Sequence, residues 1–301
     1  MRICSLLPGA TEVVATLGLA DDLVAISHEC DYPPEIRQKP VIIRSIVDPK
    51  QTSSPNIDRQ VREALREGQG LYRIDEALLR RLDPDLILTQ SLCDVCAVTP
   101  TEVKRVLADL ARRPQMISLD ATDLQGVFRD IEVIGVATGR DAKARWLVEA
   151  LTGRLAKVRA LVEGETPRRV ACIEWLDPLY CAGHWVPEMV ELAGGLDGLG
   201  TRGQYSVRID WQQILDFDPE VIVVMPCGYT AEKAVDEYRK TNFPAEWQEV
   251  QAVKDSRVFA VHASAYFSRP GPRLVEGVEI LHALLHEDFS LPLPVGSWAP
   301  V

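Results

Sequence analysis

The sequence lacks an apolar run long enough to cross a bilayer, and its opening does not have the form of a secretory signal. The first apolar stretch runs from Ile3 to Leu7 and is ended by Pro8-Gly9, which is too short for the apolar core of a signal peptide. No block of Lys and Arg offers a surface for phosphates, and the net charge of −11 argues against a general nucleic-acid binder. We expect a protein that does not insert into membranes and works in the cytoplasm, or in the periplasm or outside the cell if its true start lies upstream.

Motifs of the common enzyme classes are also missing. There is no G-x-S-x-G, no P-loop and no H-E-x-x-H. The glycine-rich stretch from Gly194 to Gly200 follows a helical pattern, whereas a dinucleotide-binding loop follows a strand, so Gly194-Gly195 is interpreted as a helix C-cap. His184 and Glu188 have the spacing of a base and its orienting partner on one helical turn, but no nucleophile stands beside them. The sequence therefore predicts no catalytic residues.

Cysteine is scarce and odd in number. Seven cysteines in a chain of 301 residues indicate free thiols in a reducing compartment. Cys93 and Cys96 form a CxxC just after a predicted strand, and His28-Glu29-Cys30 follows another strand. His28, Cys93 and Cys96 are a candidate ligand set for zinc or iron, and the alternative is that both thiols only pack a loop. Three further cysteines lie in or beside apolar strands and are expected in the core: Cys4, Cys172 and Cys227.

The sequence does contain one pattern that occurs twice. The segment Leu82-Asp83-Pro84-Asp85-Leu86-Ile87-Leu88 recurs as Phe217-Asp218-Pro219-Glu220-Val221-Ile222-Val223, and a short amphipathic run precedes each copy. Proline disfavours helical geometry in the residue before it, so each copy predicts a helix that stops at Asp-Pro and leads into a buried strand. Two copies about 135 residues apart predict two lobes of similar design, and ligands of such α/β proteins usually bind between the lobes.

Strand and helix patterns alternate in both halves of the chain; in the first half they predict a strand at 23–27, a charged surface helix at 57–67 and a helix at 101–112. Helix 9–17 is predicted to begin with Thr11 as its N-cap, and the tail from Leu291 is predicted to be irregular. Between the halves, residues 122–163 have apolar residues at the three- and four-residue spacing of a helix, with a break near Gly139. We predict an α/β fold of two Rossmann-like lobes with mostly parallel sheets, residues 1–121 and 165–301, joined by a helical linker at 122–164 that contains one long backbone helix.

Several segments carry a resemblance to a known family. The opening Ser5-Leu6-Leu7-Pro8-Gly9-Ala10-Thr11-Glu12, the stretch from Ser27 to Pro34 and both Asp-Pro repeats resemble the helical-backbone class of ABC-type substrate-binding proteins. The chain is most similar to the periplasmic cobalamin-binding proteins, whose relatives bind iron–siderophore complexes or haem. The resemblance covers nearly the whole chain, including the long helix and the stretch from Tyr266 to Arg273. It implies a non-catalytic protein that requires no cofactor and holds a corrinoid or related metal chelate between its lobes.

The resemblance also implies which loops bind the ligand, namely those at the carboxyl ends of strands in both lobes. Aromatic side chains there would give a large planar ligand flat apolar walls, and Arg269 would meet a carboxylate, amide or phosphate on its rim. The alternative is that these aromatics are ordinary core residues. An imidazole from His28 or His184 is a further hypothesis, as axial ligand to cobalt or haem iron. The expected ligand contacts are Pro8, Gly9, Ala10, Thr11, His28, Glu29, Ser91, Cys93, Tyr180, His184, Trp185, Tyr266, Phe267 and Arg269.

Two positions depart from the family pattern. Importers of this family dock on their permease through one glutamate per lobe, seven residues before the proline of each repeat. Those positions hold Ala77 and Gln212 here, so we expect no docking on a cobalamin-type permease. The alternatives to a ligand-binding protein without a transport role are a cytosolic enzyme or chaperone that handles the chelate or a metal, and a true importer component with a misassigned start.

Overall fold

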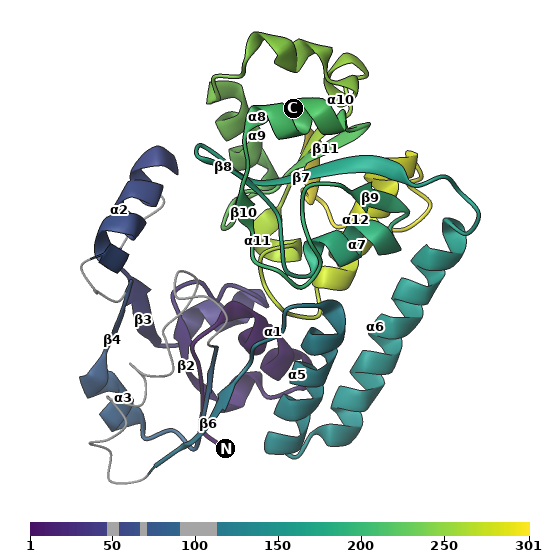
Figure 1. Cartoon of the computed structure of the whole chain (residues 1–301). Coiled ribbons are helices and arrows are strands. Elements are labelled where there is room, and N and C mark those ends of the chain that lie inside the picture. Colours follow the sequence, from purple (N-terminus) through teal and green to yellow (C-terminus); the bar gives the residue numbers. More distant parts are fainter. Residues whose placement is uncertain (47–53, 67–70, 91–112) are drawn as a thin grey trace. The chain divides into compact units, whose positions relative to one another are not determined.

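The fold is known from a computed structural model that describes residues 1–46, 54–66, 71–90 and 113–301 (Figure 1). Contacts divide the chain into two compact units. Unit 1 comprises Met1–Ala121 and Gln125–Val148, and unit 2 comprises 122–124 and Glu149–Val301. Within the described ranges, no helix is both long enough and apolar enough to span a membrane.

Unit 1 is built on a sheet with the strand order β4-β3-β2-β1-β5-β6. The strands pair in parallel, except that β4 is antiparallel to β3. The central strands are buried because apolar residues fill them on both faces, as expected for a covered parallel sheet. The strand bounds are β1 Ile3–Ser5, β2 Leu23–Ser27, β3 Val41–Ser45, β4 Tyr72–Ile74, β5 Leu86–Thr89 and β6 Gln115–Ser118.

Helices follow most of these strands, which is the pattern of parallel α/β units. The 13-residue helix α2 is charged and presents an exposed face, as its pattern predicted. The helix predicted at 101–112 lies outside the described residues. The bounds are α1 Pro8–Thr16, η1 Ala20–Asp22, η2 Pro34–Gln38, α2 Ser54–Arg66, α3 Glu76–Leu82 and α5 Leu124–Ala137.

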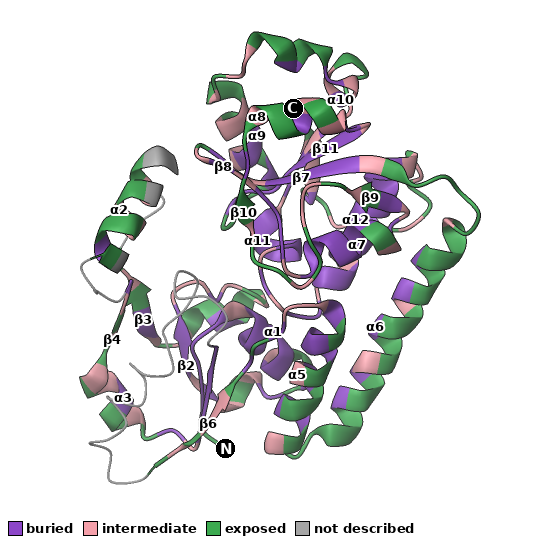
Figure 2. Cartoon of the chain, in the orientation of Figure 1, coloured by how far each residue is buried: buried purple, intermediate pink, exposed green. Residues whose placement is uncertain are grey.

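Unit 2 has a second sheet, with the order β10-β8-β7-β11-β12-β13 and β9 paired to β7. Strands β7, β11 and β12 are parallel, whereas β8, β10 and β13 run antiparallel to their neighbours. Buried residues fill β11 and most of helix α12, as the colours of Figure 2 show. The bounds are β7 Arg168–Leu176, β8 Leu179–Cys181, β9 Gly195–Asp197, β10 Val207–Arg208, β11 Val221–Val224, β12 Val258–Val261 and β13 Trp298–Pro300.

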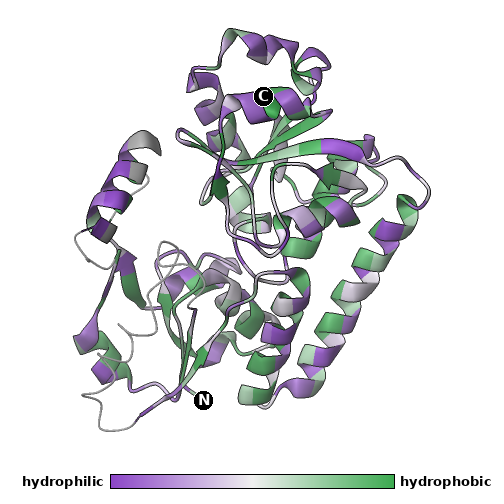
Figure 3. Cartoon of the chain, in the orientation of Figure 1, coloured by the Kyte–Doolittle hydropathy of each residue, from purple (hydrophilic) through white to green (hydrophobic). Residues whose placement is uncertain are grey.

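The helices of unit 2 include the C-terminal part of the long helix α6, Asp141–Leu161. Figure 3 shows hydrophilic and hydrophobic residues interleaved along α6, which agrees with burial of one stripe only. The predicted break near Gly139 is confirmed, because α5 ends at Ala137. The other bounds are α7 Val186–Leu192, α8 Trp211–Phe217, α9 Ala231–Lys240, η3 Ala245–Glu249, α10 Gln251–Lys254, α11 Ala263–Tyr266 and α12 Leu274–His286.

The repeated pattern forms the same local structure in both units. Helices α3 and α8 end at Asp83 and Asp218, which have positive φ values of 39° and 45°, and each Asp-Pro leads into a buried strand. The prediction of helix, stop and strand is therefore confirmed. An aspartate also caps the start of each helix, since Asp75 and Asp210 accept hydrogen bonds from the backbone of the third helical residue.

The acidic residue after each proline has a second role, which the sequence pattern did not indicate. The carboxylate of Asp85 accepts a hydrogen bond from the backbone N–H of Arg2 at 2.8 Å, and the carboxylate of Glu220 accepts one from that of Arg169 at 3.0 Å. The side chains of the same two arginines donate to carbonyls at helix ends. Arg2 donates to Leu82 at the end of α3, and Arg169 donates to Asp218 at the end of α8. Both repeats thus join a helix end to the start of the central strand, β1 or β7.

The structure corrects several local predictions. Thr11 lies inside α1 and does not cap it, because the helix begins at Pro8, a residue suited to the first helical position. Cys227 is exposed and not in the core, because it lies in the loop beyond the end of β11. The tail is not wholly irregular, since β13 pairs with β12. The sequence also left unassigned β3, β4, β9, β10 and helix α9, which are short, partly exposed or strongly charged.

Candidate functional site

In unit 1, the carboxyl ends of β1, β2 and β5 lie at one edge of the sheet because these strands are parallel. The strand order reverses at β1, which has β2 on one side and β5 on the other. Ligands of open α/β sheets bind beyond the strand ends at such a reversal. At this edge, the first turn of α1 contains the predicted contacts Pro8 to Thr11, and the loop after β2 contains His28 and Glu29. Ser91, Cys93 and Cys96 follow β5 and lie outside the described residues.

Thr11 holds two of these loops together. Its hydroxyl is fully buried and lies 2.8 Å from the Ser5 hydroxyl, 3.2 Å from the Leu7 carbonyl oxygen and 3.0 Å from the sulfur of Cys30. Gly9 and Ala10 are buried in the first turn of α1, and Pro8 is half-buried. The structure therefore brings the loops after β1 and β2 together, with Thr11 as the link between them.

His28 and Glu29 are half-buried beside this link. The Nε2 atom of His28 lies 3.4 Å from the backbone nitrogen of Ser45 and 3.2 Å from a carboxylate oxygen of Glu29. Neutral imidazole with a free Nε2 accepts from Ser45, whereas protonated imidazole donates to Glu29. Among the residues that the structure describes, no three His, Cys, Asp or Glu side chains are grouped as a metal site would require. The metal-binding hypothesis for His28 with Cys93 and Cys96 stays a prediction.

In unit 2, Trp185 and Phe267 join the start of α7 to the loop after α11. The indole nitrogen of Trp185 donates a 2.7 Å hydrogen bond to the carbonyl oxygen of Phe267, and both side chains are buried. Tyr266 is also buried, and its ring lies 5.8 Å from that of His262 in an edge-on arrangement. These aromatics hold neighbouring segments of unit 2 in place.

Arg269 lies in the same segment and is 8% exposed. Its guanidinium donates to the hydroxyl of Ser264 at 2.9 Å. A second guanidinium, that of Arg273, lies 5.6 Å from the centre of the Tyr266 ring. Two arginines therefore lie in the segment just before α12, and the guanidinium of Arg273 lies beside the Tyr266 ring.

His184 is held in a strained and unusual environment. Its φ of 53° is in the left-handed region, and its backbone N–H and carbonyl bond the backbone of Gln204 and Gly203. The imidazole lies between two rings, 5.5 Å from Trp185 and 5.3 Å from Tyr205. Its Nε2 atom is buried without a hydrogen-bond partner, and burial lowers the pKa of His184. Backbone strain of this kind is concentrated at functional sites.

Tyr205 is the aromatic residue that the sequence interpretation missed here. It is 60% exposed and lies in the loop of residues 198–206, hereafter the Tyr205 loop. The loop approaches Gly183 so closely that a Cβ atom there would lie 2.5 Å from the backbone nitrogen of Ser206. The sequence did contain a signal for Tyr205, since it is an aromatic residue in a stretch rich in Gly, Gln, Arg and Ser. Such a stretch has no helix or strand pattern that would bury the ring, so an exposed ring could have been expected.

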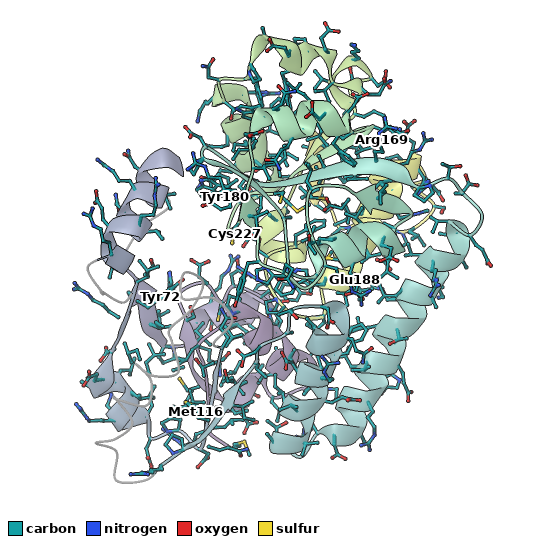
Figure 4. All side chains as sticks on the ribbon, viewed as in Figure 1. Tyr72, Met116, Arg169, Tyr180, Glu188 and Cys227 are labelled. Carbon is teal, nitrogen blue, oxygen red and sulfur yellow. The ribbon has the colours of Figure 1, made fainter. Side chains whose placement is uncertain are left out.

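Tyr180, labelled in Figure 4, lies half-buried on β8 opposite Trp175 and Arg208. Trp175 in turn packs edge-on against Tyr229, with ring centres 5.7 Å apart, and the ammonium group of Lys233 lies 3.7 Å from the centre of the Tyr229 ring. Tyr229 lies in the loop after β11, is 2% exposed and belongs to the core of unit 2, against which Trp175 packs. Neither Trp175 nor Tyr229 was predicted at the site, because both lie in or next to apolar strands.

Glu188 does not pair with His184 as the spacing suggested. Helix α7 begins at Val186, so His184 lies before the helix and not on it. One carboxylate oxygen of Glu188 accepts from the backbone N–H of Leu124 at 2.9 Å, and the other accepts from Arg202 at 2.6 Å. Burial raises the pKa of Glu188, while these two donors lower it. Glu188, which is labelled in Figure 4, therefore binds Leu124 and Arg202 and not His184.

Comparisons with known proteins agree with this fold. A family model described as periplasmic binding protein matches residues 3–265, so the chain belongs to that family. An ABC transporter substrate-binding lipoprotein of Bacillus subtilis, YvrC, is 26% identical over 293 residues, which are 95% of this chain and 80% of the relative. A vitamin B12-binding protein of Vibrio cholerae is 25% identical over 282 residues, 92% of this chain and 86% of the relative.

Solved structures have the same fold. The vitamin B12-binding protein BtuF of Vibrio cholerae superposes with a TM-score of 0.68 at 23% identity, covering 94% of this chain and 96% of its own. A periplasmic haem-binding protein of Pseudomonas aeruginosa gives a TM-score of 0.73 at 17% identity, covering 99% and 96%. The resemblance found in the sequence and the predicted two-lobed α/β class are thereby confirmed.

Proposed function

We propose that this chain binds a corrinoid through loops at its strand ends and does not transform it. The observation that carries the proposal is the 25% identity with a vitamin B12-binding protein over 92% of this chain. The aromatic residues of unit 2 support it, because Tyr180, His184 and Tyr205 occur on neighbouring strands and loops and retain exposed surface. Flat side chains of this kind suit a large macrocycle.

Haem is the competing ligand, since a solved haem-binding protein has the same fold. The test is titration of the full chain with cyanocobalamin, cobinamide and hemin, followed by calorimetry and by the visible spectrum. The proposal expects saturable binding of a corrinoid. Heat and a spectral change with hemin alone would replace the corrinoid by a haem, and no response to any of the three would refute the proposal.

Tyr205 gives a clean variant for this titration. Tyr205→Ala is expected to weaken binding by about 1–3 kcal/mol, as truncation of an aromatic contact does. The matched control is Trp146→Ala, because Trp146 is exposed to a similar degree, 64% against 60%, but lies on α6 and not at a strand end. Trp185→Ala and Tyr266→Ala should also weaken binding, but both side chains are buried, so the folded state of each variant must be checked by circular dichroism.

A second function, delivery of the ligand to an ABC importer, is favoured by the name of the Bacillus subtilis relative. It would place the chain outside the cytoplasm, and the prediction of a cytoplasmic location receives no support from the named relatives. Ala77 and Gln212 are both exposed near the starts of α3 and α8, where the family resemblance expects glutamates. We therefore expect no co-purification with a cobalamin-type permease at physiological salt; its detection would establish the importer function.

A further inference from the structure

Glu188 connects two segments of unit 2 that are far apart in sequence. The residue is 9% exposed on helix α7. Its two carboxylate oxygens have different donors: the backbone N–H of Leu124 at 2.9 Å, and the guanidinium of Arg202 at 2.6 Å. A single side chain thus joins the first residue of α5 to the Tyr205 loop.

The Arg202 contact concerns the loop that surrounds His184. Within this loop, the backbone N–H of Gly203 donates to the carbonyl oxygen of His184 at 2.8 Å, and the Tyr205 ring packs edge-on against the imidazole. Arg202 is itself 51% exposed in its side chain, so its position is set mainly by the ion pair with Glu188. Arg202 and Tyr205 are three residues apart in one loop, so a ligand that orders the Tyr205 loop would also restrict Arg202.

The Leu124 contact concerns the place where the chain passes between the units. The boundary between unit 2 and unit 1 lies after Leu124, and α5 continues from there in unit 1. The first N–H groups of a helix have no partner within the helix, and a carboxylate is favourable at this end of the helix dipole. Glu188 supplies that acceptor for α5.

We propose that Glu188 is a positioning residue that couples the Tyr205 loop to the first turn of α5. The Glu188 carboxylate is buried. If Arg202 moves away, the Leu124 amide is the remaining donor to the negative charge of Glu188, so the hydrogen bond with Leu124 must change as well. A ligand that orders the Tyr205 loop would then also order the start of α5. The ligand part of this inference rests on the proposed function, whereas the coupling between the two segments does not.

The test is hydrogen–deuterium exchange of the full chain, followed in the segments 122–126 and 198–206. Arg202→Gln removes the ion pair and keeps the carboxylate beside Leu124. Glu188→Gln keeps one oxygen that can accept from the Leu124 N–H. The amide carries no charge, so the ion pair with Arg202 is lost. Glu191→Gln is the matched control, because Glu191 is an exposed residue on the same helix and undergoes the same change of charge.

Coupling predicts that Arg202→Gln speeds exchange about tenfold in both segments, as loss of a charged hydrogen bond does, and that Glu191→Gln changes neither. Faster exchange in 198–206 alone would overturn the inference. In the wild type, cyanocobalamin should protect both segments, and in Glu188→Gln it should protect only 198–206. If cyanocobalamin does not bind, the proposed function fails, and the ligand-free comparison of Arg202→Gln with the wild type still decides the coupling.

Discussion

Arg154 gives the sharpest prediction about what stabilises unit 2. It lies on α6 and binds two glutamates of α12. Its guanidinium donates to both carboxylate oxygens of Glu279, at 2.9 and 2.6 Å, and to Glu276 at 3.1 Å. The hydrogen bond with Glu279 is the main reason why the pKa of Arg154 lies above its usual value. Arg154→Met keeps the aliphatic stem and removes all three bonds.

The size of the effect follows from burial. Glu279 is only 8% exposed, and an uncompensated buried carboxylate costs about 3–5 kcal/mol when its partner is removed. The Arg154 side chain is 34% exposed, so water reaches one side of the group and the loss is smaller. We expect Arg154→Met to lower the free energy of unfolding by about 2–3 kcal/mol.

Urea unfolding followed by tryptophan fluorescence is a suitable assay, because five of the six tryptophans lie in unit 2: Trp175, Trp185, Trp211, Trp247 and Trp298. The control is Arg145→Met, on the same helix. Arg145 pairs with Asp141 at 3.3 Å, but both side chains are more than half exposed, so the loss should be about 0.3–0.5 kcal/mol. Equal losses for the two variants would refute the assignment of stability to the Arg154 contacts.

Three further predictions concern single positions. Gly183→Ala should destabilise unit 2, because a Cβ atom would meet backbone atoms at 2.5–2.6 Å. Gly153→Ala on α6 meets nothing within 4 Å and should raise the free energy of unfolding by about 0.5–1 kcal/mol. The same urea assay measures both variants, and equal effects would contradict the close packing at Gly183. Burial lowers the pKa of His184 from its ordinary value of 6.5. The unfolded chain therefore binds a proton at His184 more readily than the folded chain, and the free energy of unfolding should fall as the pH drops below 6.5. His184→Asn, whose side chain tolerates the positive φ, should flatten this pH dependence, and an unchanged profile would argue against the assignment. Maleimide should label the exposed Cys227 in the native protein. Cys4 should be labelled only after unfolding, because it is buried and burial raises its pKa to about 12. Peptide mapping by mass spectrometry that finds Cys4 labelled in the native protein would contradict its burial.

The sequence by itself determined the features that depend on neighbouring residues. Proline restricts the residue before it whatever the rest of the chain does, so Asp83 and Asp218 ended their helices where the pattern placed the stop. Strand β2 was predicted at its observed bounds for a similar reason, since a short apolar run between polar segments is buried in almost any α/β arrangement. The resemblance to a family of binding proteins rested on the order of such segments.

Tertiary structure decided what depends on residues far apart in the chain. The ladder between β12 and the C-terminal strand β13 and the bond from Trp185 to Phe267 join segments whose own patterns do not reveal a partner. The same holds for Glu188, whose spacing to His184 suggested an acid–base pair. Its acceptors instead meet donors 64 residues before it and 14 residues after it, and only the folded chain brings those donors to one carboxylate.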